Sequence, residues 1–273
     1  DELTEYLGYA LRILKNAGLS CEGITTPGGF GSRARPELAQ ATLQSVRDVF
    51  SAEIPHYFRD LHDSGTESVA PRVEYARGLD GPDPRCVVSV LACTGDWTGG
   101  WDNLPPEGAD KFITADLQRG RMVEVIERGE PAFMLAHWTG VYWNGQELGF
   151  KIFQEVVRRL QARYDNLIWM KLAELARYWA ARELTRIERA GDRIAFRAPF
   201  ACPQFTIRLR ANAGVVPRWP TGPAGAPLTE VRDLQSLDAG MCAWEKDDLL
   251  VCIDLPKGGS LMEHVDFVYC PDS

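Results

Sequence analysis

Two ionisable residues of the sequence follow apolar runs and stand among aromatic residues. Asp96 comes shortly after the apolar run Cys86–Cys93 and is close to Trp97 and Trp101. His137 ends the apolar run 131–136 and is followed by Trp138, Tyr142 and Trp143. A carboxylate and an imidazole are common partners in general acid–base catalysis, and flat aromatic rings suit stacking on a sugar. We therefore predict that Asp96 and His137 are catalytic and converge in one pocket lined by these aromatic side chains.

Each of the two residues also has a purely structural interpretation. An aspartate in a glycine-rich loop often stabilises a turn, and a histidine after an apolar run can be a hydrogen-bonded core residue. A third chemistry would use Cys93 as a thiol nucleophile with His137 as its base, but no basic neighbour in the sequence would lower the pKa of that thiol. The pair His62–Asp63 is a candidate for metal binding, because imidazole and carboxylate groups ligate divalent cations.

The elements that would position these residues alternate between apolar runs and helical patterns from residue 1 to about 183. We predict strands over 21–26, 56–61, 86–93, 131–137 and 166–170, with helices from Pro36, around 122–126, over 150–164 and from 171 to about 184. The polar stretch 62–83 is predicted as loop. Such alternation indicates a parallel sheet covered on both faces, whose ligand site lies at the carboxyl ends of the strands. Those ends carry Thr26, His62, Asp96 and His137.

The pattern changes around Thr185. The segments 193–197, 205–210 and 249–255 lie between glycine and proline turns, and Ile207 and Leu209 alternate with Arg208 and Arg210. This period of two predicts half-buried antiparallel strands. We therefore expect an α/β protein of two domains. Residues 1–184 would form an incomplete or distorted (β/α) barrel with parallel strands, and residues 185–273 an antiparallel β-sandwich-like domain.

The composition argues against some classes of function. The 273 residues include 38 acidic and 30 basic side chains, and the formal net charge of −8 argues against a general nucleic-acid-binding protein. Arg158, Arg159 and Arg163 do cluster, but their helical spacing predicts a solvated helix face. No run of 18 apolar residues is present, so we expect no membrane-spanning helix.

Seven cysteines occur without any CxxC pair. Several lie within apolar runs, as small buried residues do, which favours a reducing compartment such as the cytoplasm and leaves a disulfide between two tail cysteines open. No signal peptide is visible. The sequence begins inside a helical pattern with Leu3, Leu7 and Leu11 on one stripe, from which we expect that further chain precedes it.

Taken in order, three short motifs within residues 1–184 resemble the later part of a NodB-like polysaccharide deacetylase, a family of glycoside hydrolase/deacetylase (β/α) barrels. Thr25-Thr-Pro-Gly-Gly stands where that family has an Arg-x-Pro loop. Cys93-Thr-Gly-Asp-Trp resembles its Asp-Trp segment, and Met134-Leu-Ala-His resembles its final apolar segment with histidine. Thr25 replaces the family's arginine. No match occurs here to the two earlier motifs, which carry the catalytic base and the Asp-His-His metal set.

The resemblance implies a carbohydrate-active hydrolase that deacetylates an acetamido sugar. His137 would be the acid that protonates the leaving group, and Asp96 would orient or tune a catalytic partner. The carbohydrate would contact Thr26, Trp97, Trp101, Trp138, Tyr142 and Trp143. A divalent metal such as zinc is implied, with only His62 and Asp63 as candidate ligands. The alternatives are a non-catalytic carbohydrate-binding protein with a degenerate barrel, or a glycosidase in which Asp96 pairs with Asp102 or Glu147.

Overall fold

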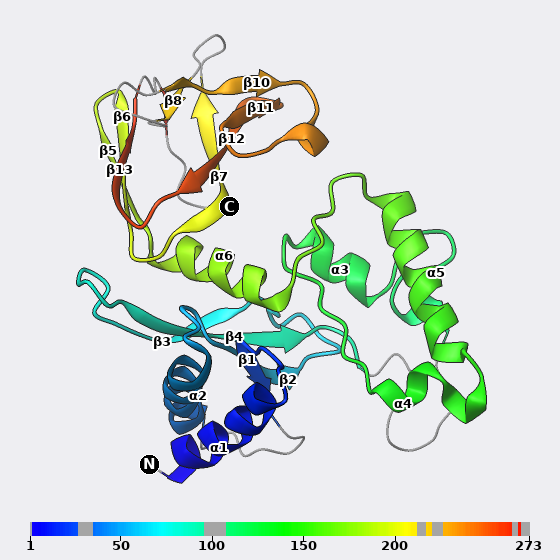
Figure 1. Cartoon of the computed structure of the whole chain (residues 1–273). Helices are drawn as coiled ribbons and strands as arrows, with labels where there is room; N and C mark the ends of the chain where they lie inside the picture. Colours follow the sequence, from blue (N-terminus) through cyan, green and yellow to red (C-terminus); the bar gives the residue numbers. More distant parts are fainter. Residues whose placement is uncertain are drawn as a thin grey trace. The chain divides into compact units, whose positions relative to one another are not determined.

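The computed structural model describes residues 2–26, 35–95, 108–211, 217–219, 226–263 and 267–268. The chain divides into two compact units, residues 1–75 with 87–173 and residues 76–86 with 174–273 (Figure 1). The division falls near the start of a helix that precedes the β-rich tail, whereas the sequence suggested a boundary after that helix, at 184/185. All residues of the predicted site belong to the first unit.

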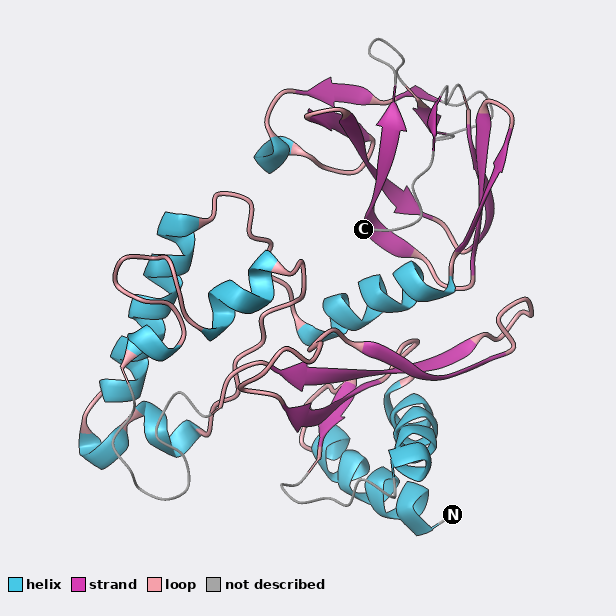
Figure 2. Ribbon diagram, turned by 180° about the vertical axis from the view of Figure 1, so that it is seen from behind, coloured by secondary structure: helices cyan, strands magenta, loops and turns pink. Residues whose placement is uncertain are grey.

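A four-stranded sheet contains the parallel strands that the sequence predicted. Its order is β1 (Gly23–Thr25), β2 (His56–Leu61), β4 (Arg85–Ala92) and β3 (Arg72–Arg77). Both the β1–β2 and the β2–β4 pairs are parallel, as the arrows in Figure 2 show. The apolar body of β4 explains its core position, since β4 is buried over nearly its whole length, whereas only the first two residues of β2 are buried.

The parallel arrangement continues past the end of β4. The backbone N–H of Cys93 donates to the carbonyl of Phe133 at 2.8 Å, and Thr94 forms a parallel bridge with Met134. The predicted parallel arrangement is therefore confirmed for β1, β2 and β4, whereas the segment that ends near Ala136 joins them through a single bridge and the segment that ends near Met170 is not part of the sheet. The strands of the described residues form an open sheet and not a closed barrel.

Three sequence predictions about strands were wrong. Residues 166–170 are irregular, with Ile168 82% exposed, because their apolar run has no partner strand among the described residues. Residues 131–137 form one bridge instead of a full strand. The predicted loop 62–83 contains β3, whose charged residues Arg72, Glu74 and Arg77 hid it from a search for apolar strands.

Two helices cover one face of this sheet. α1 (Glu2–Asn16) and α2 (Arg35–Phe50) lie side by side in Figure 1. Leu38 and Leu43 of α2 pack against Tyr57 of β2 and Val87 of β4. The helix begins beside Pro36 as predicted, because a proline in the first turn loses no helical hydrogen bond.

A second core forms around the segment that follows β4. It joins Leu91 and Cys93 to residues of η2 (Ala109–Lys111), α3 (Arg121–Glu127) and α5 (Leu148–Arg163). Between α3 and α5 the chain forms α4 (Trp138–Val141) and η3 (Trp143–Gly145). This core holds the carboxyl end of β4 against the helices that follow it.

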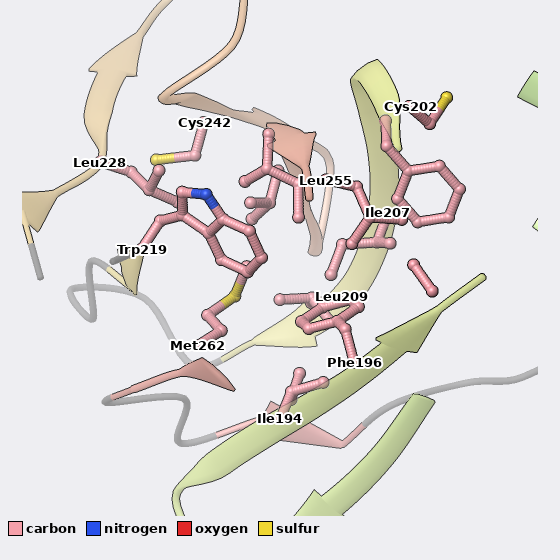
Figure 3. Packing of buried hydrophobic residues seen from close by; sticks show 14 of the residues in the cluster. Ile194, Phe196, Cys202, Ile207, Leu209, Trp219, Leu228, Cys242, Leu255 and Met262 are labelled. Atoms are coloured by element: carbon pink, nitrogen blue, oxygen red, sulfur yellow. The ribbon is translucent and has the colours of Figure 1, made fainter. Parts of the chain in front are cut away.

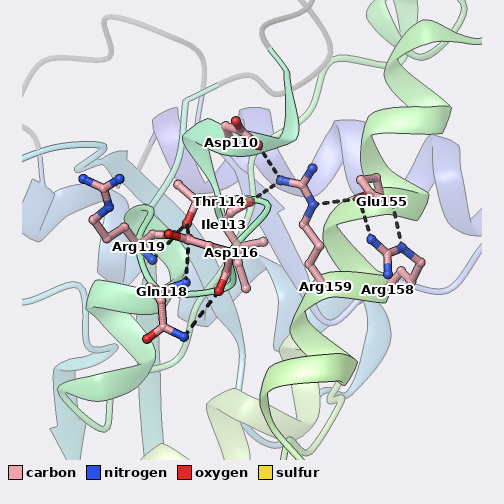
Figure 4. Close-up of polar contacts among 9 residues, drawn as sticks. All are labelled: Asp110, Ile113, Thr114, Asp116, Gln118, Arg119, Glu155, Arg158 and Arg159. Atoms are coloured by element: carbon pink, nitrogen blue, oxygen red, sulfur yellow. Dashed lines mark hydrogen bonds and ion pairs between the residues drawn. The ribbon is translucent and has the colours of Figure 1, made fainter.

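Of the basic cluster on α5, Arg158 is solvated as its spacing predicted, whereas Arg159 and Arg163 are largely covered. Arg159 is only 12% exposed, and it donates to Glu155, to Asp110 and to the carbonyl of Ile113 (Figure 4). Hydrogen bonds from Arg158 and Arg159 lower the pKa of Glu155 to about 2, so this carboxylate stays ionised. The network ties α5 to η2, which carries Lys111.

The second unit is the β-rich tail together with most of α6 (Leu172–Leu184). Its predicted antiparallel strands are confirmed, since β7 (Cys202–Ala211) pairs antiparallel with β12 (Asp248–Leu255). Alternate residues of these strands point into one core, shown in Figure 3. The remaining strands are β5 (Arg186–Ala190), β6 (Arg193–Ala198), β8 (Arg218–Trp219), β9 (Ala226–Pro227), β10 (Thr229–Val231), β11 (Met241–Glu245), β13 (Gly258–Met262) and β14 (Phe267–Val268), with a 3₁₀ turn, η4 (Leu234–Ser236).

Candidate functional site at the strand ends

The carboxyl ends of the parallel strands meet at one edge of the sheet. The backbone N–H of His62, just after β2, donates to the carbonyl of Ala92 at the end of β4 at 2.9 Å. Thr26, just after β1, donates through its hydroxyl to the carbonyl of Phe58 in β2 at 2.9 Å. Thr26 therefore lies at the predicted edge, and its hydroxyl proton is engaged in joining two strands.

A carboxylate and an ammonium group flank the glycine that precedes Asp96. A Cβ placed on Gly95 would lie 3.2 Å from Asp63 Oδ2 and 3.8 Å from Lys111 Nζ. The absence of a side chain at Gly95 thus lets Asp63 and Lys111 approach the backbone at the end of β4. Asp96 itself, with Trp97 and Trp101, lies outside the described residues, so the predicted convergence of Asp96 with His137 is untested.

A buried arginine that the sequence did not reveal joins these strand ends. Arg121 is 6% exposed, and its guanidinium donates to the carbonyls of His62, Gly65 and Cys93 at 2.8–3.1 Å. It also contacts Glu124 at 3.3 Å. One side chain therefore fixes the loop after β2 to the end of β4. No motif marks it in the sequence, because its partners are backbone atoms from distant segments.

Two polar atoms at this edge are buried without a hydrogen-bond partner among the described residues. They are the hydroxyl oxygen of Thr94 and Nδ1 of His62, which lies 3.5 Å from a carboxylate oxygen of Glu67. Leaving such a group unsatisfied costs about 1–3 kcal/mol.

His137 follows by three residues Met134, which forms the bridge to Thr94 just after β4. It is half-buried, has extended backbone angles (φ −95°, ψ 128°) and immediately precedes α4. After it, Tyr142 is 58% exposed and Trp143 is half-buried. Trp138 begins α4, but its side chain lies outside the described part of the chain.

The position of α4 depends on a close backbone contact with α5. A Cβ added to Gly149 of α5 would lie 2.5 Å from the carbonyl oxygen of Gly140 and 3.0 Å from Cα of Val141. Only glycine allows this approach, because both obstructing atoms belong to the backbone of α4. Gly149 therefore helps to set the position of the segment that begins with His137.

We predict that Gly149→Ala displaces α4 and destabilises the first unit by about 1–3 kcal/mol, the usual cost of overpacking. Thermal unfolding measures this change. Gly108→Ala is the matched control, since its φ is −66° and an added Cβ would have no neighbour within 4 Å. Equal stability of the two variants would contradict the proposed contact.

The implied metal does not fit the residues described. Among them, no group of three or more His, Cys, Asp or Glu side chains could hold a metal ion. Asp63, one of the two candidate ligands, shares its position beside Gly95 with the Lys111 ammonium, which opposes a bound cation. We therefore derive no chemical step through a metal at His62 and Asp63.

The thiol of Cys93 is unsuited to act as a nucleophile. Cys93 is fully buried, and this burial raises the pKa of its thiol to about 11. Because the raised pKa favours the neutral form, the thiol stays protonated at neutral pH. Cys21, Cys86, Cys93, Cys202, Cys242 and Cys252 are all free thiols.

Alkylation should distinguish Cys93 from the more accessible Cys21. At about pH 8, iodoacetamide should modify the half-buried Cys21 and leave Cys93 unmodified in the folded chain, as read by peptide mass spectrometry. Unfolding in urea should make both thiols react. Fast modification of Cys93 in the folded chain would reopen the interpretation of Cys93 as a nucleophile.

An open pocket of about 470 Å³ lies at the opposite, amino end of β1 and β2. It is lined by His56, Gly23 and neighbouring residues of the segment 19–23. Burial lowers the pKa of His56 and so favours its neutral form. A Cβ on Gly23 would lie 2.5 Å from this ring, so His56 packs on the neighbouring strand. The pocket is distant along the strands from the predicted residues, and we assign it no chemistry.

Comparison of the chain with protein-family models, curated proteins and solved structures finds no match. The resemblance to NodB-like deacetylases therefore stays an expectation from three short motifs. Among the described helices, none is long and apolar enough to cross a membrane. The case for a function accordingly depends on the geometry of the strand ends.

Proposed function

We propose that the first unit is a carbohydrate-active hydrolase of the deacetylase type, with its site at the carboxyl ends of β1, β2 and β4. The observation that carries this proposal is the meeting of His62, Gly95 and the segment before His137 at one edge of a parallel sheet. Ligand sites of parallel sheets lie at this edge. The resemblance of the motifs around Asp96 and His137 supports the reaction type.

In the proposed reaction, water adds to the acetamide carbonyl and the C–N bond breaks. His137, as an imidazolium, would donate its proton to the departing nitrogen, and Asp96 would orient or tune its partner in this transfer. The water oxygen ends in acetate, and a proton from the water returns His137 to its imidazolium form, so the products are acetate and the free amine of the sugar and the protons balance. Arg121 would act as a positioning residue, because it contacts backbone carbonyls at the strand ends.

The exposure of Tyr142 supports one further candidate function, that of a protein that binds carbohydrate without cleaving it. Its ring is 58% exposed and follows His137 by five residues. An exposed aromatic ring offers a flat apolar surface for a sugar, whether or not a bond is later broken. Both candidates therefore place the carbohydrate at the same edge and differ only in turnover.

The test is incubation of the purified chain with N-acetylglucosamine oligomers. A deacetylase should release acetate, detected by NMR, and leave a free amine on an oligomer of unchanged length. Binding in calorimetry without acetate release would favour the carbohydrate-binding protein. Shortened oligomers would favour the glycosidase. Neither binding nor any product would contradict the proposal.

A further inference from the structure

One face of α1 presents large apolar side chains to solvent. Tyr6, Tyr9 and Ile13 are 71%, 66% and 54% exposed, although their spacing of three and four residues places them on one stripe of the helix. The opposite stripe, with Leu7 and Leu11, packs against α2. The helix therefore has two apolar faces, of which the described residues cover one. An exposed apolar patch of this kind commonly marks an interaction surface.

Charged residues border the exposed stripe of Tyr6, Tyr9 and Ile13, and their order along the helix favours an antiparallel neighbouring helix. Glu5 stands in the first half of the helix and Arg12 in the second half. At 3.6 residues per turn, both lie on the same side of the stripe formed by Tyr6, Tyr9 and Ile13. Lys15 does not contribute to this border, because its ammonium donates to the carbonyl of Val49 at 2.6 Å.

We propose that this face is the interface of a symmetric dimer in which α1 packs antiparallel on α1 of a second copy. A two-fold axis near Tyr9 sets Tyr6 opposite Ile13 of the partner subunit, because these residues lie at similar distances on either side of Tyr9. The same symmetry sets Glu5 opposite Arg12 of the partner subunit, and repeats both contacts. A parallel two-fold pair would instead place the charged borders of the two helices on opposite sides of the interface, where Glu5 could not pair with Arg12.

The antiparallel arrangement is favoured by two further physical effects. It places the positive end of each helix dipole beside the negative end of the neighbouring helix. It also buries the rings of Tyr6 and Tyr9 around the axis, where aromatic residues contribute most to association. Because one short helix buries less than a standard interface of about 800 Å² per partner, the dimer should be concentration-dependent.

Sedimentation of the whole chain tests the proposal over protein concentrations from about 1 µM to about 200 µM. The wild-type chain should shift from the mass of one copy to the mass of two. Tyr9→Arg should stay a single copy throughout. Glu5→Lys and Arg12→Glu should each raise the dimer Kd by about tenfold or more, because each creates two like-charge contacts. The combination of both charge changes should restore the dimer.

Circular dichroism establishes that each variant keeps its helices, and Ile168→Arg serves as the matched control. Ile168 is also an exposed apolar residue of the first unit, but it lies outside α1, so its replacement should leave the dimer intact. A wild-type chain that sediments as one copy at every concentration would overturn the proposal. So would a dimer that survives Tyr9→Arg, or a double charge variant that stays a single copy.

Discussion

His137→Ala is expected to lower kcat for acetate release by about 10²–10⁴-fold, the usual contribution of a general acid. The loss should come from proton transfer, since His137 stands at the strand-end edge and immediately precedes α4. KM should change little, because the predicted aromatic contacts remain. Steady-state kinetics on an N-acetylated oligomer measures both constants.

Thermal unfolding must accompany that assay, because His137 is half-buried. A catalytic role predicts a midpoint close to that of the wild-type chain. His56→Gln is the matched control, since it removes an imidazole at the opposite end of the same strands and should retain turnover. If His137→Ala instead unfolds the first unit, His137 is a core residue. If it folds and keeps full activity, the proton comes from another group.

Arg121→Met is expected to destabilise the strand ends, lowering the free energy needed to open them by about 3 kcal/mol or more. The substitution removes charge-assisted hydrogen bonds to the carbonyls of His62, Gly65 and Cys93, each contributing roughly 1.5–3 kcal/mol. The buried carbonyl of Cys93 would then lack this donor. Hydrogen exchange of the β4 amides measures the change within the first unit, separately from the β-rich unit.

Two variants make the Arg121 measurement specific. Arg121→Lys keeps the charge but loses the planar fork, and should recover only part of the stability. Arg128→Met removes a neighbouring arginine that is 30% exposed and pairs with Glu130, and it should cost no more than about 1 kcal/mol. Unchanged exchange in Arg121→Met would show that the guanidinium does not join the strand ends.

β4 was predictable from sequence because it is a nearly continuous apolar run, and β2 because of its aromatic residues. β4 is buried almost throughout, and β2 matches its predicted range His56–Leu61. β3 was missed because Arg72, Glu74 and Arg77 interrupt any apolar run, although Glu74 accepts hydrogen bonds from Arg59 of β2 and Ser89 of β4. Residues 166–170 show the converse error, since an apolar run forms a strand only where another strand offers its backbone.

The residues of the candidate site could likewise be predicted only in part. The rule that parallel strands gather their carboxyl ends correctly placed Thr26 and His62 at one edge, and Met134, three residues before His137, bridges to Thr94 beside it. It could not identify Arg121 or Lys111, which reach that edge from segments that follow the strand. Their contacts are with backbone atoms and with a glycine, and neither leaves a periodic or spaced signal in the sequence.

The most direct test of the strand-end site uses an N-acetylglucosamine oligomer that carries a photoreactive group. After irradiation, peptide mass spectrometry locates the cross-links, and excess unlabelled oligomer shows which of them are specific. We predict specific cross-links within residues 92–97 and 135–143, at the carboxyl ends of the parallel strands. Specific cross-links confined to other parts of the chain, or none that the unlabelled oligomer suppresses, would contradict a carbohydrate site at this edge.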